Sequence, residues 1–175
     1  MSSSGGKTDA CLSCEFQENL DILRETYFFS ALPLEILKVF AYLCTREKFK
    51  EGDHLFTEGD DDGQAFYIIS GQAHLFYTND NEERIVREVE PEMFIGGLSL
   101  MGKMRRLFSL QATADTVCLV LSREKFTKAM EQFPAQMPKI FNALVDRICQ
   151  WEEKVIAEID VTCESCQRRI GVSII

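Results

Sequence analysis

The stretch that decides the fold is Met93-Phe94-Ile95-Gly96-Gly97-Leu98-Ser99-Leu100-Met101, followed by Arg105-Arg106 and by the strand-like run from Ser109 to Ala114. Two adjacent glycines let backbone N–H groups approach an anion without interference from a Cβ atom. A helix beginning at Leu98 would add free N–H groups and the positive end of its dipole. An arginine a few residues later supplies a planar fork for a phosphate. Residues 93–106, called the cassette below, therefore indicate an anion site, and the alternative is a tight turn beside two solvated arginines.

Glycine turns also precede the cassette. They lie in Lys50-Glu51-Gly52-Asp53, in Glu58-Gly59-Asp60, and in Ser70-Gly71 after the run Ala65 to Ile69. In this order, the turns and the cassette resemble the cyclic nucleotide-binding domain of the catabolite activator/FNR family and of kinase regulatory subunits. The resemblance covers roughly residues 32–159. It implies a mainly β fold with flanking helices, a double-stranded β-helix (jelly roll) that binds a cyclic nucleotide, and a long C-terminal dimerisation helix.

The cassette departs from the family pattern where that pattern contacts the ligand. The family has a glutamate for the ribose 2′-hydroxyl where this chain has Gly97. Arg106 matches the family arginine that pairs with the cyclic phosphate, but Leu107 and Phe108 follow it where the family has small residues. A lost charge-assisted hydrogen bond costs roughly 1.5–3 kcal/mol, so we expect weak or altered ligand specificity. The ligand-binding residues predicted in this way are Gly96, Gly97, Leu98, Ser99 and Arg106.

The composition is that of a globular chain with a single domain. Its 175 residues are 46% hydrophobic and 27% charged, which suits one well-formed core. The formal net charge of −9 disfavours non-specific binding to nucleic acid, which needs a basic surface. No run of about 18 apolar residues is present, so we expect no membrane span. The polar N-terminus lacks the apolar core of a secretory signal, and we expect a cytoplasmic protein.

The hydrophobic pattern predicts helices near both ends of the chain and short strands between them. Helical spacing predicts two helices, over 16–29 and 33–44. Runs rich in β-branched and aromatic residues predict strands over 55–56, 65–69, 73–77, 84–89 and 116–121. We interpret Asp60-Asp61-Asp62 as a solvated acidic turn rather than a calcium site. Ser122 is expected to cap a helix over 123–132, which ends before Pro134.

A last helix is predicted over 138–160. Its apolar positions recur every three or four residues: Ile140, Leu144, Ile148, Trp151, Val155 and Ile159. Such a stripe suits either a seam between two helices or packing against the chain's own barrel. We expect a homodimer through residues 138–160, because a helix of this length overhangs a small barrel. Few residues follow the helix, so we expect no helix-turn-helix and no direct DNA binding.

Two Cys-x-x-Cys pairs lie near the ends of the chain, formed by Cys11 with Cys14 and by Cys163 with Cys166. Four such thiolates can hold zinc or an iron–sulfur cluster if the fold, or a dimer, brings the ends together. One pair alone can act as a redox dithiol, and the remaining interpretation is two unrelated exposed pairs. The other cysteines, Cys44, Cys118 and Cys149, lie in apolar patterns and are expected to be inert core residues.

The predicted organisation is a flexible tail over 1–15, one domain over 16–160 and a C-terminal tail over 161–175. The two histidines, His54 and His74, suggest no nucleophile–base set, so we expect no enzyme activity. The first hypothesis is a noncatalytic sensor in which a cyclic nucleotide or another small anionic effector biases the long helix towards an unidentified downstream protein. The alternatives are a redox- or metal-responsive protein acting through the terminal cysteines, and a dimeric scaffold with a closed pocket.

Overall fold

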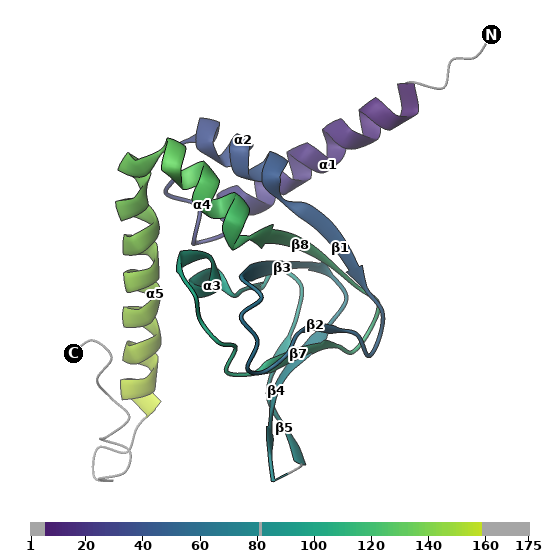
Figure 1. Cartoon of the computed structure of the whole chain (residues 1–175), viewed down its shortest axis with the longest axis vertical. Helices are drawn as coiled ribbons and strands as arrows, with labels where there is room; N and C mark the ends of the chain where they lie inside the picture. Colours follow the sequence, from purple (N-terminus) through teal and green to yellow (C-terminus); the bar gives the residue numbers. More distant parts are fainter. Residues whose placement is uncertain (1–5, 81, 159–175) are drawn as a thin grey trace.

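Two four-stranded antiparallel sheets form the body of the chain, and helices cover one end of it (Figure 1). The computed structural model describes residues 6–80 and 82–158, with the side chains of 14–80 and 82–157. One sheet has the order β1-β8-β3-β6, with strands Thr45–Phe49, Thr116–Ser122, Gln64–Ser70 and Phe94–Ile95. The other has the order β2-β7-β4-β5, with strands His54–Phe56, Ser109–Ala112, Ala73–Asn79 and Glu82–Val89. The predicted mainly β fold with flanking helices is confirmed.

The strands form where the sequence pattern placed them, with two additions. Each of the five strands predicted from composition is present and extends one or two residues beyond at least one predicted end, and the strand-like run from Ser109 forms β7, which ends at Ala112. The pattern missed β1, whose sequence Thr-Arg-Glu-Lys-Phe is charged and never buried, and β6, which is only two residues long. Both are held by their neighbours, because β1 pairs with β8 along its whole length and β6 pairs with β3.

The helices are α1 (Gly6–Glu25), α2 (Leu34–Leu43), α3 (Gly97–Met101), α4 (Arg123–Gln132) and α5 (Met137–Glu158), with a 3-10 turn at Pro134–Gln136. Residues 6–15, which the sequence assigned to a flexible tail, continue α1. The helix ends at Glu25, four residues earlier than predicted, so Tyr27 stands in the turn between α1 and α2. The predicted cap of α4 is present, since the N–H of Lys125 donates to Oγ of Ser122 at 3.3 Å.

Aromatic side chains join the helices to the sheets. The buried rings of Phe28 and Phe29 lie 4.8 Å apart, and Phe40 of α2 stacks on Phe126 of α4 at 5.6 Å. Phe28 also contacts Phe94 of β6, so this helical core reaches the cassette. A second apolar cluster fills the space between the sheets. Burying each large apolar side chain contributes about 1.5–3 kcal/mol, so α2 and α4 are fixed on the end of the roll.

The long helix α5 shares its apolar stripe between two environments. Ile140 and Leu144 are 1% and 7% exposed and belong to the helical core of their own chain. Ile148 and Val155 are half-buried and Trp151 is exposed, while Ile159 lies outside the described residues. A dimer seam through Ile140 and Leu144 is therefore wrong, because these side chains already pack within the chain.

Within the described ranges, none of the helices combines the length and apolar character that crossing a bilayer requires.

Candidate functional site

The cassette backbone turns sharply at Gly96 between β6 and α3. Gly96 has a φ of 86°, a left-handed conformation that L side chains rarely adopt. A Cβ atom there would lie 2.7 Å from Nη1 of Arg106 and 2.8 Å from the carbonyl oxygen of Gln64. Glycine is therefore required both by the backbone conformation and by the close approach of the arginine. The helix α3 begins directly afterwards at Gly97, one residue before the predicted Leu98.

Arg106 is buried and already bound within the chain. Its Nε and Nη2 donate to the two carboxylate oxygens of Asp62, each at 2.9 Å, and Nη2 also donates to the carbonyl oxygen of Gln64. The guanidinium carbon lies 4.0 Å from the centroid of the Phe56 ring, so an aromatic face covers the charge. A buried charge needs a partner of this kind, because removing it from water is costly. Asp62 thus occupies two of the donors of Arg106 that could otherwise bind an anion.

The acidic turn Asp60-Asp61-Asp62 is exposed at Asp60 and Asp61, as predicted, but two of its carboxylates form ion pairs that the sequence did not indicate. Besides the pair made by Asp62, Asp61 pairs with Arg123 at the start of α4, and this arginine lowers the pKa of the Asp61 carboxyl. Nε of Arg123 donates to the carbonyl oxygen of Ser99 at 2.6 Å. The turn therefore connects the cassette to α4. Among the residues whose side chains are described, no cluster of three or more His, Cys, Asp or Glu could hold a metal ion.

The five predicted site residues surround one cavity of about 280 Å³. The sequence predicted free N–H groups at the start of α3. The N–H of Ser99 is not free, because it donates to the carbonyl oxygen of Gly96 at 2.9 Å. Oγ of Ser99, in contrast, is buried and has no partner among the described residues. Leu98 and Leu107 are exposed, and both line the cavity with the half-buried Phe108, so its mouth is apolar.

Gly97 is tightly packed at the position where the family carries a glutamate. A Cβ atom at this position would lie 3.0 Å from the ring of Phe94 and 3.1 Å from the ring of Phe28. Both rings belong to the aromatic contacts that hold the helices against the roll. At the position where the family has the glutamate that binds the ribose, this chain therefore has two aromatic rings packed against Gly97.

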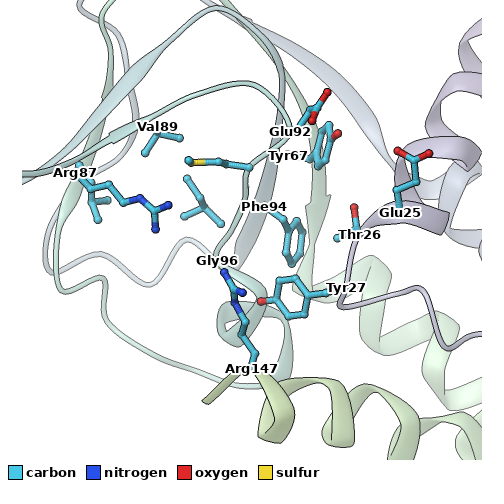
Figure 2. A pocket seen from close by; sticks show the side chains of 13 residues that line it. Glu25, Thr26, Tyr27, Tyr67, Arg87, Val89, Glu92, Phe94, Gly96 and Arg147 are labelled. Carbon is cyan, nitrogen blue, oxygen red and sulfur yellow. The ribbon is translucent and has the colours of Figure 1, made fainter. Parts of the chain in front are cut away.

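A larger cavity of about 590 Å³ adjoins the first one and shares four of its lining residues: Tyr27, Leu75, Ile95 and Gly96. Figure 2 shows Tyr27 between the cassette and α5, beside Phe94 and with Arg147 next to its ring. The guanidinium carbon of Arg147 lies 5.3 Å from the Tyr27 centroid. Burial raises the pKa of Tyr27, while the charge of Arg147 acts in the opposite direction. Tyr27 therefore links the roll to the long helix.

The sequence did not indicate Tyr27, Arg87 or Arg147 as site residues. Tyr27 formed part of a helical pattern, Arg87 lies on an exposed strand, and Arg147 is a charged position on a long helix. They meet only because the turn after α1, the strand β5 and the helix α5 line one cavity. No local sequence signal distinguishes them from ordinary surface residues.

The cysteines divide by environment. Cys118 is buried and Cys44 is half-buried, and burial raises the pKa of each to about 12. Cys149 is exposed on α5, so its assignment to the core is wrong. Cys11 and Cys14 both lie on α1, and Cys14 is exposed with its Sγ 3.6 Å from Oε1 of Glu18. Because Cys163 and Cys166 lie outside the described residues, the shared metal or redox site stays a prediction.

Comparison with known proteins gives consistent matches. The Cyclic AMP receptor protein of Thermus thermophilus is 31% identical over 109 residues, which are 61% of this chain and 50% of that protein. The cAMP-dependent protein kinase regulatory subunit of Debaryomyces hansenii is 29% identical over 110 residues, 62% of this chain and 24% of that protein. The chain thus spans half or less of these curated relatives.

Solved structures show the same fold. The N-terminal domain of a transcriptional regulator from Streptomyces coelicolor A3(2) matches with a TM-score of 0.68 and 24% identity, covering 80% of this chain and 97% of that one. A family model, described as the cyclic nucleotide-binding domain, matches residues 46–133, about half of the chain. On the strength of this match, which includes the glycine turns, the cassette and Arg106, the chain belongs to the cyclic nucleotide-binding domain family.

Proposed function

We propose that this chain is a noncatalytic sensor whose cavity binds a small effector with altered specificity and only weak affinity for cyclic nucleotides. The observation that carries the proposal is the bidentate pair between Arg106 and Asp62. An arginine binds a phosphate best through two parallel N–H donors. Here Nε and Nη2 are committed to Asp62, so a phosphate would find Nη1 alone and would face the negative charge of Asp62.

The ribose end of a cyclic nucleotide would also lose a partner, because Gly97 supplies no carboxylate. A charge-assisted hydrogen bond contributes roughly 1.5–3 kcal/mol, which corresponds to about ten- to a hundredfold in affinity. The exposed Leu98 and Leu107 at the mouth of the smaller cavity favour an occupant with apolar surface. These features support a ligand other than cyclic AMP or cyclic GMP.

The output element of the proposed sensor is α5. Arg147 of this helix contacts Tyr27, and Tyr27 contacts Phe94 of the cassette with ring centroids 6.0 Å apart. An effector that enters beside Tyr27 would change the contact that holds α5 against the roll, which is the differential interaction that a two-state signal requires. We further propose that α5 mediates homodimerisation and transmits the signal to a downstream protein.

Calorimetric titration with cyclic AMP and with cyclic GMP tests this function. The unmodified chain should bind both weakly, with dissociation constants above about 10 μM. The variant Asp62→Asn keeps the size of the side chain but removes the charge beside Arg106, and should bind cyclic AMP about tenfold more tightly. Asp61→Asn is the matched control, because Asp61 pairs with Arg123 instead, and should give no gain.

Submicromolar binding of cyclic AMP by the unmodified chain would show that the cassette is a working nucleotide site. No gain in Asp62→Asn would instead favour the scaffold with a closed pocket. Restoring a glutamate at position 97 is a poorer test, since its Cβ atom would press on the rings of Phe28 and Phe94.

A further inference from the structure

The uncompensated positive charge of the larger cavity lies away from Arg106. Arg87 of β5 and Arg147 of α5 both line this cavity. Within the described residues, neither arginine forms an ion pair with a carboxylate, and the guanidinium of Arg147 lies over the Tyr27 ring. Arg106, in contrast, is neutralised by Asp62. A phosphate held at the cassette would need the unpaired positive charge at Arg106. In the joined cavities that charge lies instead at Arg87 and Arg147.

The two guanidiniums approach the same space from different elements. In Figure 2, Arg87 extends from one side of the cavity and Arg147 extends upward from α5 beside Tyr27. The two carboxylates of the cavity, Glu25 and Glu92, lie near Tyr67 on the far side of Phe94. They act on Tyr67, whose pKa is raised first by burial and then by these two charges. Among the residues that line this cavity, the carboxylates therefore lie away from the two arginines.

The walls between the arginines and the cassette are apolar. Leu75, Val89, Met93 and Ile95 line the larger cavity, and Leu75 and Ile95 continue into the smaller one. An occupant that reaches from the arginines towards the cassette would therefore have an apolar body. Its charged group would lie at the end next to α5.

We propose that the joined cavities bind an amphipathic organic acid, an aryl or alkyl carboxylate or sulfonate, whose acid group is attracted by both Arg87 and Arg147. The apolar body lies against Leu75, Val89 and Ile95 and points towards the cassette. The inference rests on the proposed sensor function and names the class of its effector. An anion between the two arginines draws α5 towards β5, because it attracts both guanidiniums. Effector binding then fixes the position of the output helix directly.

A pair of fluorescent probes that differ in charge tests the proposal. The acid probe is 8-anilinonaphthalene-1-sulfonate, and the neutral probe is N-phenyl-1-naphthylamine, which has the same rings without the sulfonate. Trp151 is the only tryptophan of the chain and lies one turn after Arg147 on α5. Energy transfer from Trp151 therefore reports bound acid probe, and the arginine variants locate that probe in the cavity.

The variants are Arg87→Gln, Arg147→Gln and the double variant, with Arg84→Gln as the control. Arg84 is an exposed arginine on the same strand as Arg87, and it does not line the cavity. Each single variant should weaken binding of the acid probe about five- to tenfold, and the double variant should remove the energy transfer, because each loses a charge-assisted contact. Arg84→Gln should bind like the unmodified chain, and binding of the neutral probe should change less than about twofold in every variant.

Failure of the acid probe to bind the unmodified chain would overturn the proposal, as would equal binding by the double variant. A parallel loss of the neutral probe would also overturn it, because the cavity itself would then have collapsed. These outcomes are independent of the cyclic AMP titrations. If the arginine variants have no effect but Asp62→Asn gains cyclic AMP affinity, the inference fails while the sensor function stands. If the unmodified chain binds cyclic AMP tightly, the proposed specificity fails whatever the probes show.

Discussion

At the scale of single residues, Gly96 is the position where backbone conformation and packing coincide. Replacing it with alanine should destabilise the fold by about 2–4 kcal/mol, because the methyl group adds a clash with Arg106 and Gln64 to the cost of a positive φ. Gly52→Ala is the matched control, since Gly52 has a φ of 91° but nothing within 4 Å of its Cβ position. That control should cost only about 1–2 kcal/mol. Urea denaturation measures the free energy of unfolding of both variants. An equal loss in the two would show that the cassette shifts to accommodate the methyl group.

Asp62 should contribute to stability as well as to specificity. Asp62→Ala leaves the buried guanidinium of Arg106 without its carboxylate, which should cost about 2–4 kcal/mol, somewhat less than a fully buried pair because Asp62 is partly exposed. Lys50 and Asp115 form an ion pair of similar length at the surface, so Asp115→Ala should have little effect. Urea denaturation measures the free energy of unfolding of both variants. An equal loss in the two would contradict this account.

The thiols differ in reactivity according to their burial. Because burial raises the pKa of Cys44 and Cys118 to about 12, both remain protonated at neutral pH and should resist alkylation while the chain is folded. Cys149, which is exposed on α5, should react. A pulse of iodoacetamide followed by peptide mass spectrometry gives the order of labelling, and denaturant should remove the difference. Early labelling of Cys118 would mean that the core between the sheets opens readily.

At the scale of elements, α5 has one face packed within the chain and another exposed. The exposed face carries Phe141, Val145 and Ile156, which are 59%, 41% and 47% exposed, whereas Trp151, 51% exposed, continues the stripe of Ile140 and Leu144. Val145→Glu should convert the proposed dimer to a folded monomer, because a charge would be desolvated in the seam. Light scattering at tens of micromolar, a concentration suited to about micromolar association, measures this change.

Two other positions of α5 serve as controls for the dimer. Lys154→Glu changes an exposed polar position and should leave the dimer intact. Leu144→Glu should instead unfold the chain, because Leu144 belongs to the helical core. A monomeric unmodified chain at these concentrations would remove the proposed dimer altogether. A folded monomer in Leu144→Glu would show that the sequence-based seam was the correct one.

At the scale of the whole molecule, the cassette connects the sheets to every helix that follows it. Arg123 joins α4 both to the acidic turn, through Asp61, and to α3, through the carbonyl oxygen of Ser99. Phe28 joins the same region to the turn after α1 through its contact with Phe94. We expect a change at the cassette to reach α4, and through the 3-10 turn α5, along these contacts.

The terminal cysteine pairs give a prediction that concerns the ends of the chain. If Cys11, Cys14, Cys163 and Cys166 share a zinc ion or an iron–sulfur cluster, anaerobically purified protein should contain metal in a fixed ratio to the chain. Replacing either pair with serine should release all of it. Elemental analysis provides the measurement, and metal-free anaerobic protein would eliminate the shared site.

The sequence by itself determined most of the elements and the family. Strand and helix patterns, the glycine turns and the Ser122 cap depend on interactions between residues that are close along the chain, so their physical basis is visible in the sequence. The same reasoning identified the residues from Gly96 to Ser99 and Arg106, which do surround one cavity. That they bind a ligand remains a prediction.

Only the tertiary structure decided how the charges and the faces are paired. Asp62 and Arg106 are 44 residues apart, and their pairing depends on the path of two loops. The apolar stripe of α5 predicted a buried face, but its period does not state whether the chain itself or a second copy covers that face. Arg87 and Arg147 likewise became candidates only when β5 and α5 were seen to line the same cavity. Periodicity and composition specify what must be buried or solvated, whereas long-range packing selects the partner.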